Sequence, residues 1–315
     1  TLCVILPEEE GFASKLREIA EECRVNLFYA PCGTVALISI DETTLPEDLS
    51  VLCYIFASAL GKESNFNDEV GEYTIHLDRK FVRTSPFLTY EVFNKYHTET
   101  EMMRYIKRLE RKDISLTHSM ISLGSCTMKL NAASEVIPLS NPAFCNVHPY
   151  APEEQVQGSL ELLENLKELL GTITGLPVVS LQPNSGAAGE YAGLRTIRSY
   201  HEAHGNGHRN KVLLPASAHG TNPASASQCG YQCVIVACDQ HGNVDWEDFM
   251  KKSEEHKDDL AAMMITYPST HGIFETNIID LCKRIHDCGA LVYMDGANMN
   301  AQVGLTSPGF IGADV

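Results

Sequence analysis

The chain has 315 residues, of which 44% are hydrophobic and 21% are charged, an ordinary composition for a globular protein. Its formal net charge of −17 disfavours nucleic acid as a partner, because an acidic surface repels the phosphate backbone. No apolar run approaches the roughly 20 residues that a membrane span requires, and the sequence opens on Thr1 without a signal or transit peptide, so we expect an internal fragment.

Residues 1–62 are predicted to form a small α/β domain. Apolar or small residues recur at helical spacing in this region, and a Pro-Cys-Gly turn separates two runs that have the composition of strands. The last helix of the domain is expected to end at Gly61, since glycine is a common C-terminal stop. In chain order, the expected elements are the strand Leu2–Leu6, the helix Phe12–Cys23, the strands Val25–Tyr29 and Thr34–Ile40, and the helix Glu47–Leu60.

Residues 63–150 are polar and irregular, apart from a helix predicted at Thr98–Lys112. An irregular stretch of this length inside a compact protein is normally functional or wraps a partner. We therefore interpret this region as a connecting segment with a functional role.

From residue 151 to the end, helices alternate with short apolar strands, beginning with the amphipathic helix Gln155–Leu170. This alternation predicts a parallel sheet that is covered on both faces. Ligands bind at the carboxyl ends of the strands in such sheets, so functional residues should follow each strand. The five predicted strands are Val178–Leu181, Val212–Leu214, Cys233–Ala237, Ala262–Thr266 and Ala290–Met294.

A segment rich in small residues, Gln182–Tyr191, follows the first predicted strand and opens a helix. Free backbone N–H groups and the positive end of the helix suit a phosphate. The alternative is a tight strand–helix turn that uses glycine for packing. The segment matches neither a Walker loop nor the G-x-G-x-x-G pattern, which disfavours a nucleotide site.

His219 follows the second predicted strand, and Thr266 and Thr270 lie at the end of the fourth. A histidine in this position can stack on a flat ring or act as an acid or base, or it can simply cap the next helix. The two hydroxyls can hydrogen-bond a phenolic oxygen or a substrate carboxylate, or they can belong to a plain turn.

Asp295 follows the fifth predicted strand. A carboxylate at the end of an apolar strand is costly unless it is paired. A protonated pyridine nitrogen is one suitable partner, because the ion pair keeps the ring cationic as an electron sink; a structural salt bridge or cap is the alternative. A phosphate loop, a stacking histidine, a hydroxyl turn and a terminal aspartate are together the supports that pyridoxal phosphate needs.

Eleven cysteines raise the question of disulfides or a metal. Several of them, including Cys53 and Cys282, lie inside apolar stretches, where we expect the thiol to pack as a small hydrophobe. No C-x-x-C pair occurs, and Cys229 and Cys233 come nearest to one. The sequence therefore predicts no metal site, and it favours a reducing compartment.

Five segments of the chain resemble the P-protein family, the pyridoxal-phosphate glycine decarboxylases of the glycine cleavage system. The resemblance runs from about residue 75 to the end, and the preceding residues agree in order with the two-module chain of that family, in which the small domain of a first, degenerate module precedes a catalytic module. The segments are Gly124–Asn131, Gln182–Tyr191, Ser217–Ser225, Ile265–Gly272 and Met294–Gly304.

The resemblance implies the fold-type-I architecture of the aminotransferases. Residues 151–315 would form a pyridoxal-phosphate-binding large domain that is incomplete at its C-terminus, and residues 63–150 would reach the mouth of the active site, with Ser125–Asn131 as a loop over it. By matching position, Ser185, Gly186 and Ala187 would hold the phosphate, His219 would stack on the ring, Thr266 and Thr270 would lie near the ring oxygen or substrate, and Asp295 would pair with the pyridine nitrogen, with Asn298 nearby.

The Schiff-base lysine of the family is expected beyond Val315. The last lysine of this chain is Lys283, and none follows Asp295. We therefore expect the chain by itself to be an inactive fragment.

For the intact enzyme, the resemblance implies release of carbon dioxide from glycine and transfer of the aminomethyl group to the lipoyl arm of the H-protein. It also implies a homodimer in the mitochondrial matrix. Two alternatives stay open at this point. One is a non-catalytic scaffold or dimerisation module of the same enzyme, and the other is a nucleotide enzyme that uses the glycine-rich loop.

Overall fold

The computed structural model describes residues 1–64, 66, 78–114 and 132–315. They divide into two compact units, Thr1–His97 and Thr98–Val315. The Ser125–Asn131 loop lies outside the described residues, and the three-part organisation expected from the sequence stays a prediction.

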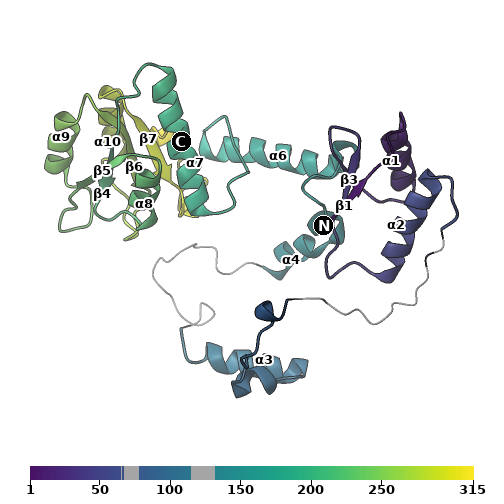
Figure 1. Ribbon diagram of the computed structural model, residues 1–315. Helices are drawn as coiled ribbons and strands as arrows, with labels where there is room; N and C mark the ends of the chain where they lie inside the picture. The colour runs from purple at the N-terminus through teal and green to yellow at the C-terminus, as the bar shows by residue number, and fades with distance from the viewer. Residues whose placement is uncertain (65, 67–77, 115–131) are drawn as a thin grey trace. The chain divides into compact units, whose positions relative to one another are not determined.

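The first unit contains a three-stranded antiparallel sheet in the order β1-β3-β2 and two helices (Figure 1). Its apolar core joins Leu16 and Ala20 of the first helix to Ile55 and Ala59 of the second. The expected elements are confirmed in kind and order, with slightly different ends. They are β1 (Leu2–Ile5), α1 (Phe12–Glu22), β2 (Phe28–Tyr29), β3 (Val35–Ile38) and α2 (Pro46–Ala59), followed by the 3₁₀ turns η1 (Arg79–Phe81) and η2 (Glu91–Asn94).

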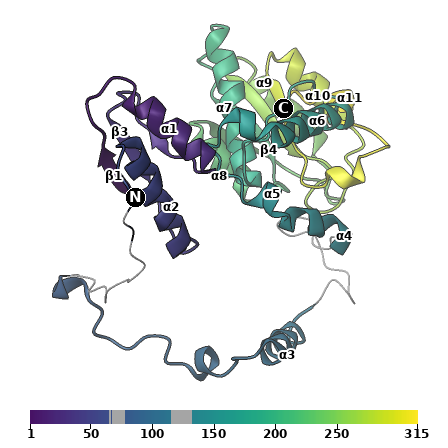
Figure 2. The same cartoon turned by 90° about the vertical axis from the view of Figure 1, so that its right-hand side faces the viewer.

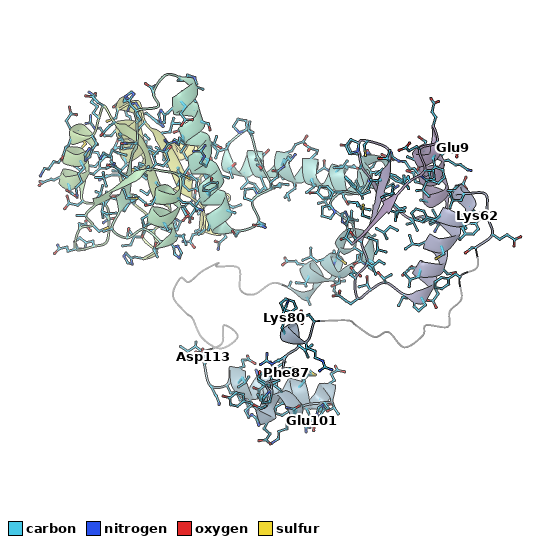
Figure 3. The ribbon with its side chains drawn as sticks, in the orientation of Figure 1. Glu9, Lys62, Lys80, Phe87, Glu101 and Asp113 are labelled. Atoms are coloured by element: carbon cyan, nitrogen blue, oxygen red, sulfur yellow. The ribbon has the colours of Figure 1, made fainter. Side chains whose placement is uncertain are left out.

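The second unit begins with α3 (Glu99–Glu110), the one helix expected in the irregular region. A capping box starts it: Thr98 Oγ1 accepts from the Glu101 backbone N–H at 3.2 Å, and the Glu101 carboxylate, labelled in Figure 3, accepts from the Thr98 N–H at 3.3 Å. Short turns precede the long helix α6 (Gln157–Thr174), which has no buried residue. The turns are α4 (Ala133–Val136), η3 (Ile137–Ser140), α5 (Pro142–Cys145) and η4 (Glu153–Gln155).

A four-stranded sheet in the order β5-β4-β6-β7 forms the centre of the second unit, and every neighbouring pair is parallel. Parallel strands need crossover connections, which helices supply here. The strands are β4 (Lys211–Pro215), β5 (Gln232–Val236), β6 (Leu260–Thr266) and β7 (Leu291–Asp295); the helices around them are α7 (Gly186–Ala203), α8 (Thr221–Gln228), α9 (Trp246–Glu255), α10 (Ile278–Asp287), the 3₁₀ turn η5 (Met299–Ala301) and α11 (Pro308–Ile311).

Helices cover both faces of this sheet (Figure 1; Figure 2), and a separate apolar cluster lies on each face. Because side chains alternate along a strand, Met263 packs with α9, α10 and α11, whereas its neighbour Met264 packs with α7 and α8. All seven residues of β6 are buried, as expected for a central parallel strand. The predicted helix–sheet–helix layering is thus confirmed.

The strand predicted at Val178–Leu181 is wrong. No strand among the described residues pairs with this segment, which is irregular, and the Val178 side chain is 88% exposed. A short apolar run becomes a strand only where a neighbouring strand satisfies its backbone groups, and sequence composition does not reveal that partner.

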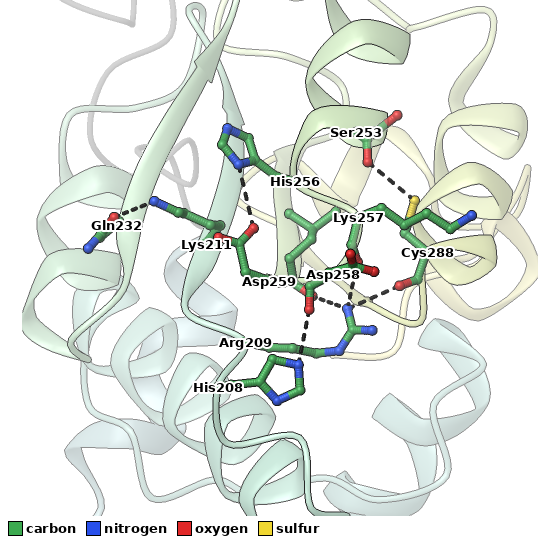
Figure 4. Close-up of polar contacts among 11 residues, drawn as sticks. His208, Arg209, Lys211, Gln232, Ser253, His256, Lys257, Asp258, Asp259 and Cys288 are labelled. Carbon is green, nitrogen blue, oxygen red and sulfur yellow. Dashed lines mark hydrogen bonds and ion pairs between the residues drawn. The ribbon is translucent and has the colours of Figure 1, made fainter.

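Arg209 ties together the segments that lead into the amino ends of three strands (Figure 4). Its Nη1 lies 3.1 Å from the carbonyl oxygen of Lys257, 2.7 Å from that of Leu260 and 3.0 Å from that of Cys288. One guanidinium therefore satisfies carbonyls from segments that are 48 to 79 positions away in the sequence.

The cysteines of the described residues are free. Cys282 packs in the core as expected, and burial raises the pKa of its thiol to about 12. Cys53 is instead exposed, because the helix α2 directs Ile55 and Ala59 into the core and leaves Cys53 on its outer side. Within the same residues, no group of three or more His, Cys, Asp or Glu side chains could hold a metal ion.

Candidate functional site

The expected site residues lie at the carboxyl ends of β4, β6 and β7 and at the amino end of α7. Ser185 precedes α7 as its N-cap, and its Oγ accepts from the backbone N–H of Ala188 at 3.1 Å. Gly186 and Ala187 are the first two residues of the helix and are exposed. A Cβ added at Gly186 or Gly189 would meet nothing within 4 Å, so the space above this helix end is open.

Asp295 and Thr266 lie side by side on the face of the sheet that α7 and α8 cover. They are register partners at the ends of β7 and β6. Each is two residues beyond a member of the cluster on that face, Tyr293 and Met264 respectively, and therefore points the same way. The Asp295 carboxylate accepts from Asn222 Nδ2 at 3.0 Å through Oδ2 and from the Ala297 N–H at 3.1 Å through Oδ1.

A buried carboxylate, Glu190, lies at the centre of the site and was not among the residues expected from the sequence. It is 5% exposed. Its Oε1 accepts from Thr221 Oγ1 at 2.7 Å and from Asn222 Nδ2 at 3.0 Å, and its Oε2 accepts from Ser225 Oγ at 2.6 Å. All three donors come from α8, so Glu190 joins the two helices that cover this face.

His219 belongs to the same hydrogen-bond network. Its Nδ1 lies 2.8 Å from Thr221 Oγ1 and 3.3 Å from the Thr221 backbone nitrogen. A continuous chain of hydrogen bonds therefore runs from His219 through Thr221, Glu190 and Asn222 to Asp295. The network brings together two expected site residues that are 76 positions apart in the sequence.

Among the described residues, three buried polar atoms of Thr266, Thr270 and Asn222 have no hydrogen-bond partner: Thr266 Oγ1, Thr270 Oγ1 and Asn222 Oδ1. A buried polar atom without a partner costs about 1–3 kcal/mol. Unpaired hydroxyls at the end of β6 therefore suit a ligand that offers a phenolic oxygen or a carboxylate. Asn298, which is also buried, instead donates from Nδ2 to the carbonyl of Pro268 at 3.3 Å and joins the loops that follow β7 and β6.

Tyr293 lies below the network on the same face. Burial raises the pKa of its phenol, and the negative charges of Asp295 and Glu190 raise it further. The phenol therefore stays protonated and neutral beside the two carboxylates.

Glu190 could have been found in the sequence through its spacing. It precedes Leu194 and Ile197 by four and seven residues, so it shares the buried face of α7 with them. A charged residue on an otherwise apolar helix face needs partners, and here the partners are uncharged Ser, Thr and Asn side chains that give no charge pattern to search for.

The fold is that of the pyridoxal-phosphate-dependent enzymes of fold type I. A crystal structure of glycine decarboxylase (P-protein) of the glycine cleavage system, in inhibitor-bound form, matches with a TM-score of 0.57 at 16% identity and covers 88% of this chain and 57% of that one. A glutamate decarboxylase domain from Vibrio parahaemolyticus matches with a TM-score of 0.50 at 14% identity, over 94% of this chain and 61% of that one.

The chain belongs to the glycine cleavage system P-protein family, whose sequence profile matches residues 74–315. It is 64% identical over its whole length to a glycine dehydrogenase (decarboxylating) of Bacteroides fragilis, and covers 33% of that protein. It is 53% identical over 96% of its length to a mitochondrial glycine dehydrogenase (decarboxylating) of Solanum tuberosum, of which it covers 29%. The chain thus spans about a third of the length of the curated relatives it matches.

Proposed function

We propose that this chain carries the pyridoxal-phosphate site of a glycine decarboxylase, which releases carbon dioxide from glycine and passes the aminomethyl group to the lipoyl arm of an H-protein. The observation that carries the proposal is the hydrogen-bond chain from His219 to Asp295. It connects the residue that would stack on the ring to the residue that would pair with the ring nitrogen.

The residues present fit the cofactor. The open amino end of α7, with Ser185, Gly186 and Ala187, would receive the phosphate. The buried hydroxyls of Thr266 and Thr270, which lack partners in the part of the chain that the structure describes, would gain them from the ring oxygen or the substrate carboxylate. When bound, pyridoxal phosphate supplies a cationic ring that accepts the electrons left as carbon dioxide departs.

Asp295 would hold the proton at the ring nitrogen. Each of its oxygens accepts one hydrogen bond, from Asn222 or from Ala297, and a carboxylate oxygen can accept two. The carboxylate is therefore fixed in position and keeps acceptor capacity. The tight burial of its neighbours Asn222 and Thr266 excludes water from one side of the site, which strengthens such an ion pair.

The partners and the location follow from the family. A lipoylated H-protein and a second copy of the chain are proposed as partners, and glycine as the substrate. Among the described helices, none has both the length and the apolar character that a membrane crossing requires. The name of the plant relative supports a mitochondrial location, whereas relatives of higher identity come from bacteria, so we propose the mitochondrial matrix for a eukaryotic source only.

A non-catalytic scaffold is the second candidate, and α6 favours it. Leucines along this helix remain 38% to 61% exposed, and a large exposed apolar surface marks an interaction site. The exposed leucines are Leu160, Leu162, Leu163, Leu166 and Leu169. A scaffold of this kind would leave the buried polar network without a function, which is why we prefer the decarboxylase.

Cofactor binding and glycine decarboxylation by the native protein test the proposal. We expect visible absorbance from bound pyridoxal phosphate, and release of labelled carbon dioxide from carboxyl-labelled glycine when lipoylated H-protein is present. Replacement of His219 by Ala should weaken cofactor binding. A native protein that binds no pyridoxal phosphate would contradict the proposal, and tight binding of a nucleotide would favour the nucleotide enzyme instead.

A further inference from the structure

We propose that Glu190 is the positioning residue of this site: through Asn222 it fixes the carboxylate of Asp295, and through Thr221 it fixes the ring of His219. The roles of Asp295 and His219 toward a cofactor rest on the proposed function. The positioning itself is a property of the protein without the cofactor.

Glu190 is held as an acceptor of hydrogen bonds only. Its carboxylate is buried, and the groups that reach it are the hydroxyls of Thr221 and Ser225 and the amide of Asn222. Hydrogen bonds to an ionised carboxylate are shorter and about twice as strong as those between neutral groups. The distances of 2.6 and 2.7 Å to the two hydroxyls are those of charge-assisted bonds.

Asn222 transmits the position of Glu190 to Asp295. The side chain is fully buried, and its Nδ2 donates one hydrogen to Glu190 and the other to Asp295, both at 3.0 Å. If the amide were flipped, its oxygen would face two carboxylates, so the two acceptors fix its orientation. Loss of Glu190 removes one of these acceptors and frees the amide to turn, which releases Asp295.

Thr221 transmits the position of Glu190 to His219. The hydroxyl has a single proton, which the short contact of 2.7 Å directs to the Glu190 carboxylate. Its oxygen must then accept in the 2.8 Å contact with His219, so Nδ1 of His219 carries the proton. In this tautomer Nδ1 cannot accept from the Thr221 N–H, so the longer 3.3 Å contact between these two nitrogens is not a hydrogen bond. Glu190 thus sets the orientation and the tautomer of the ring.

The conservative replacement Glu190→Gln removes the negative charge of the side chain and keeps its size and shape. The amide oxygen can still accept from Thr221 and Asn222, and the amide nitrogen can donate to Ser225, whose hydroxyl can also accept. Glu190→Gln should therefore keep the geometry with weaker bonds, whereas Glu190→Ala leaves the three donors without an acceptor. Thr221→Val keeps the shape of the side chain and breaks only the link to His219.

Crystal structures of these variants, in the absence of pyridoxal phosphate, test the positioning directly. We expect Glu190→Ala to turn the Asn222 amide and displace both the Asp295 carboxylate and the His219 ring, and Glu190→Gln to restore both. In Thr221→Val only His219 should move. Unchanged positions of Asp295 and His219 in Glu190→Ala would overturn the inference, whether or not the protein binds a cofactor. If Glu190→Ala does not fold, the other two variants decide: an unmoved His219 in Thr221→Val overturns it.

Cofactor affinity in the native protein gives the second readout. We expect the dissociation constant of pyridoxal phosphate to rise about tenfold to a hundredfold in Glu190→Ala, from the loss of hydrogen bonds to a charged group, and less in Glu190→Gln. Thr221→Val should not raise the dissociation constant further in the Glu190→Ala background, because both replacements break the same link from Glu190 to His219. The matched control is Glu202→Ala, a carboxylate in the last turn of the same helix that is 51% exposed and paired with Arg198; it should leave the affinity unchanged.

The two proposals fail in different ways. If the unaltered protein binds no pyridoxal phosphate, the proposed function fails, and the crystal structures still decide the role of Glu190. If the unaltered protein binds the cofactor and the Glu190 variants bind it equally well with the same absorbance maximum, Glu190 is merely structural and the inference alone is overturned.

Discussion

Thr266 and Asp295 are paired at the last register position of the β6–β7 ladder, and both point toward α7 and α8. The Asp295 carboxylate is held by Asn222, whereas the Thr266 hydroxyl is buried and has no partner among the residues that the structure describes. Two neighbouring strand ends thus present a fixed charge beside an unused donor. This combination suits a flat ligand that carries a basic nitrogen and an oxygen on the same ring.

Replacement of Asp295 by Asn tests whether the negative charge of this side chain is needed for activity. The amide oxygen can still accept from Asn222, so the fold should persist, but it cannot hold a protonated ring nitrogen by an ion pair. We expect glycine decarboxylation by the native protein to fall at least about a hundredfold, since a lost charge-assisted bond is worth about 3 kcal/mol. Asp287→Asn, at the exposed end of α10, serves as the control in the same assay; activity equal to that of the control would count against the role of Asp295.

Replacement of Arg209 by Met tests the link between strand ends shown in Figure 4. Three carbonyls would lose their donor, and we expect the free energy of unfolding in urea to fall by about 2–4 kcal/mol. Lys211→Met removes a cation two residues away whose partner is Gln232 at the exposed surface, and it should change stability by less than about 0.5 kcal/mol. Equal effects of the two replacements would contradict the structural role of Arg209.

The unfolding free energy should depend on pH through His201. The residue is 1% exposed, and its Nε2 lies 2.8 Å from the Ala261 carbonyl, so Nε2 carries the proton, while the buried Nδ1 has no partner within the described ranges. Burial lowers the pKa of His201 from its ordinary value of 6.5; the bond to Ala261 opposes this effect, and the charge of Arg209 adds to it.

The unfolded chain then binds a proton more readily than the folded one. The contribution of His201 to the unfolding free energy is therefore fully present above pH 6.5 and falls as the pH drops below that value. We expect urea unfolding at pH 7 and at pH 5.5 to show this loss, and His201→Gln to show less of it than the unaltered protein. His204→Gln, at the exposed C-cap of the same helix, should retain it. An identical pH dependence in His201→Gln would show that other groups cause it.

Replacement of Gly193 by Ala tests how closely α7 approaches the sheet. The new Cβ would lie 2.5 Å from Tyr293 Cε2 and 2.8 Å from Val315 Cγ1, so the helix or the ring must shift. We expect a loss of about 1–3 kcal/mol in unfolding free energy. Gly189→Ala, four residues earlier on the same helix, meets nothing within 4 Å and should be neutral or slightly stabilising. A neutral Gly193→Ala would mean that α7 can move away from β7 without cost.

The periodicity of the sequence was sufficient to predict four parallel strands and the helices between them, because burial on both faces leaves continuous apolar runs such as Leu260–Ile265. The position of Asp295 and His219 at strand ends followed from the same reasoning. Two features were missed. Val178–Leu181 depends on a pairing partner that composition does not specify, and Glu190 depends on uncharged partners that lie 31 to 35 positions away.

The separation of these partners also bears on synthesis. Glu190 and Asn222 can meet once α8 has been made, but Asp295 joins them only when a further 73 residues have emerged from the ribosome. Until then Asn222 Nδ2 can donate to Glu190 but not to Asp295, and the ligand site of the nascent chain is incomplete. Binding of the ligand would therefore indicate that β7 has been added beside β6 and that the sheet is correctly assembled.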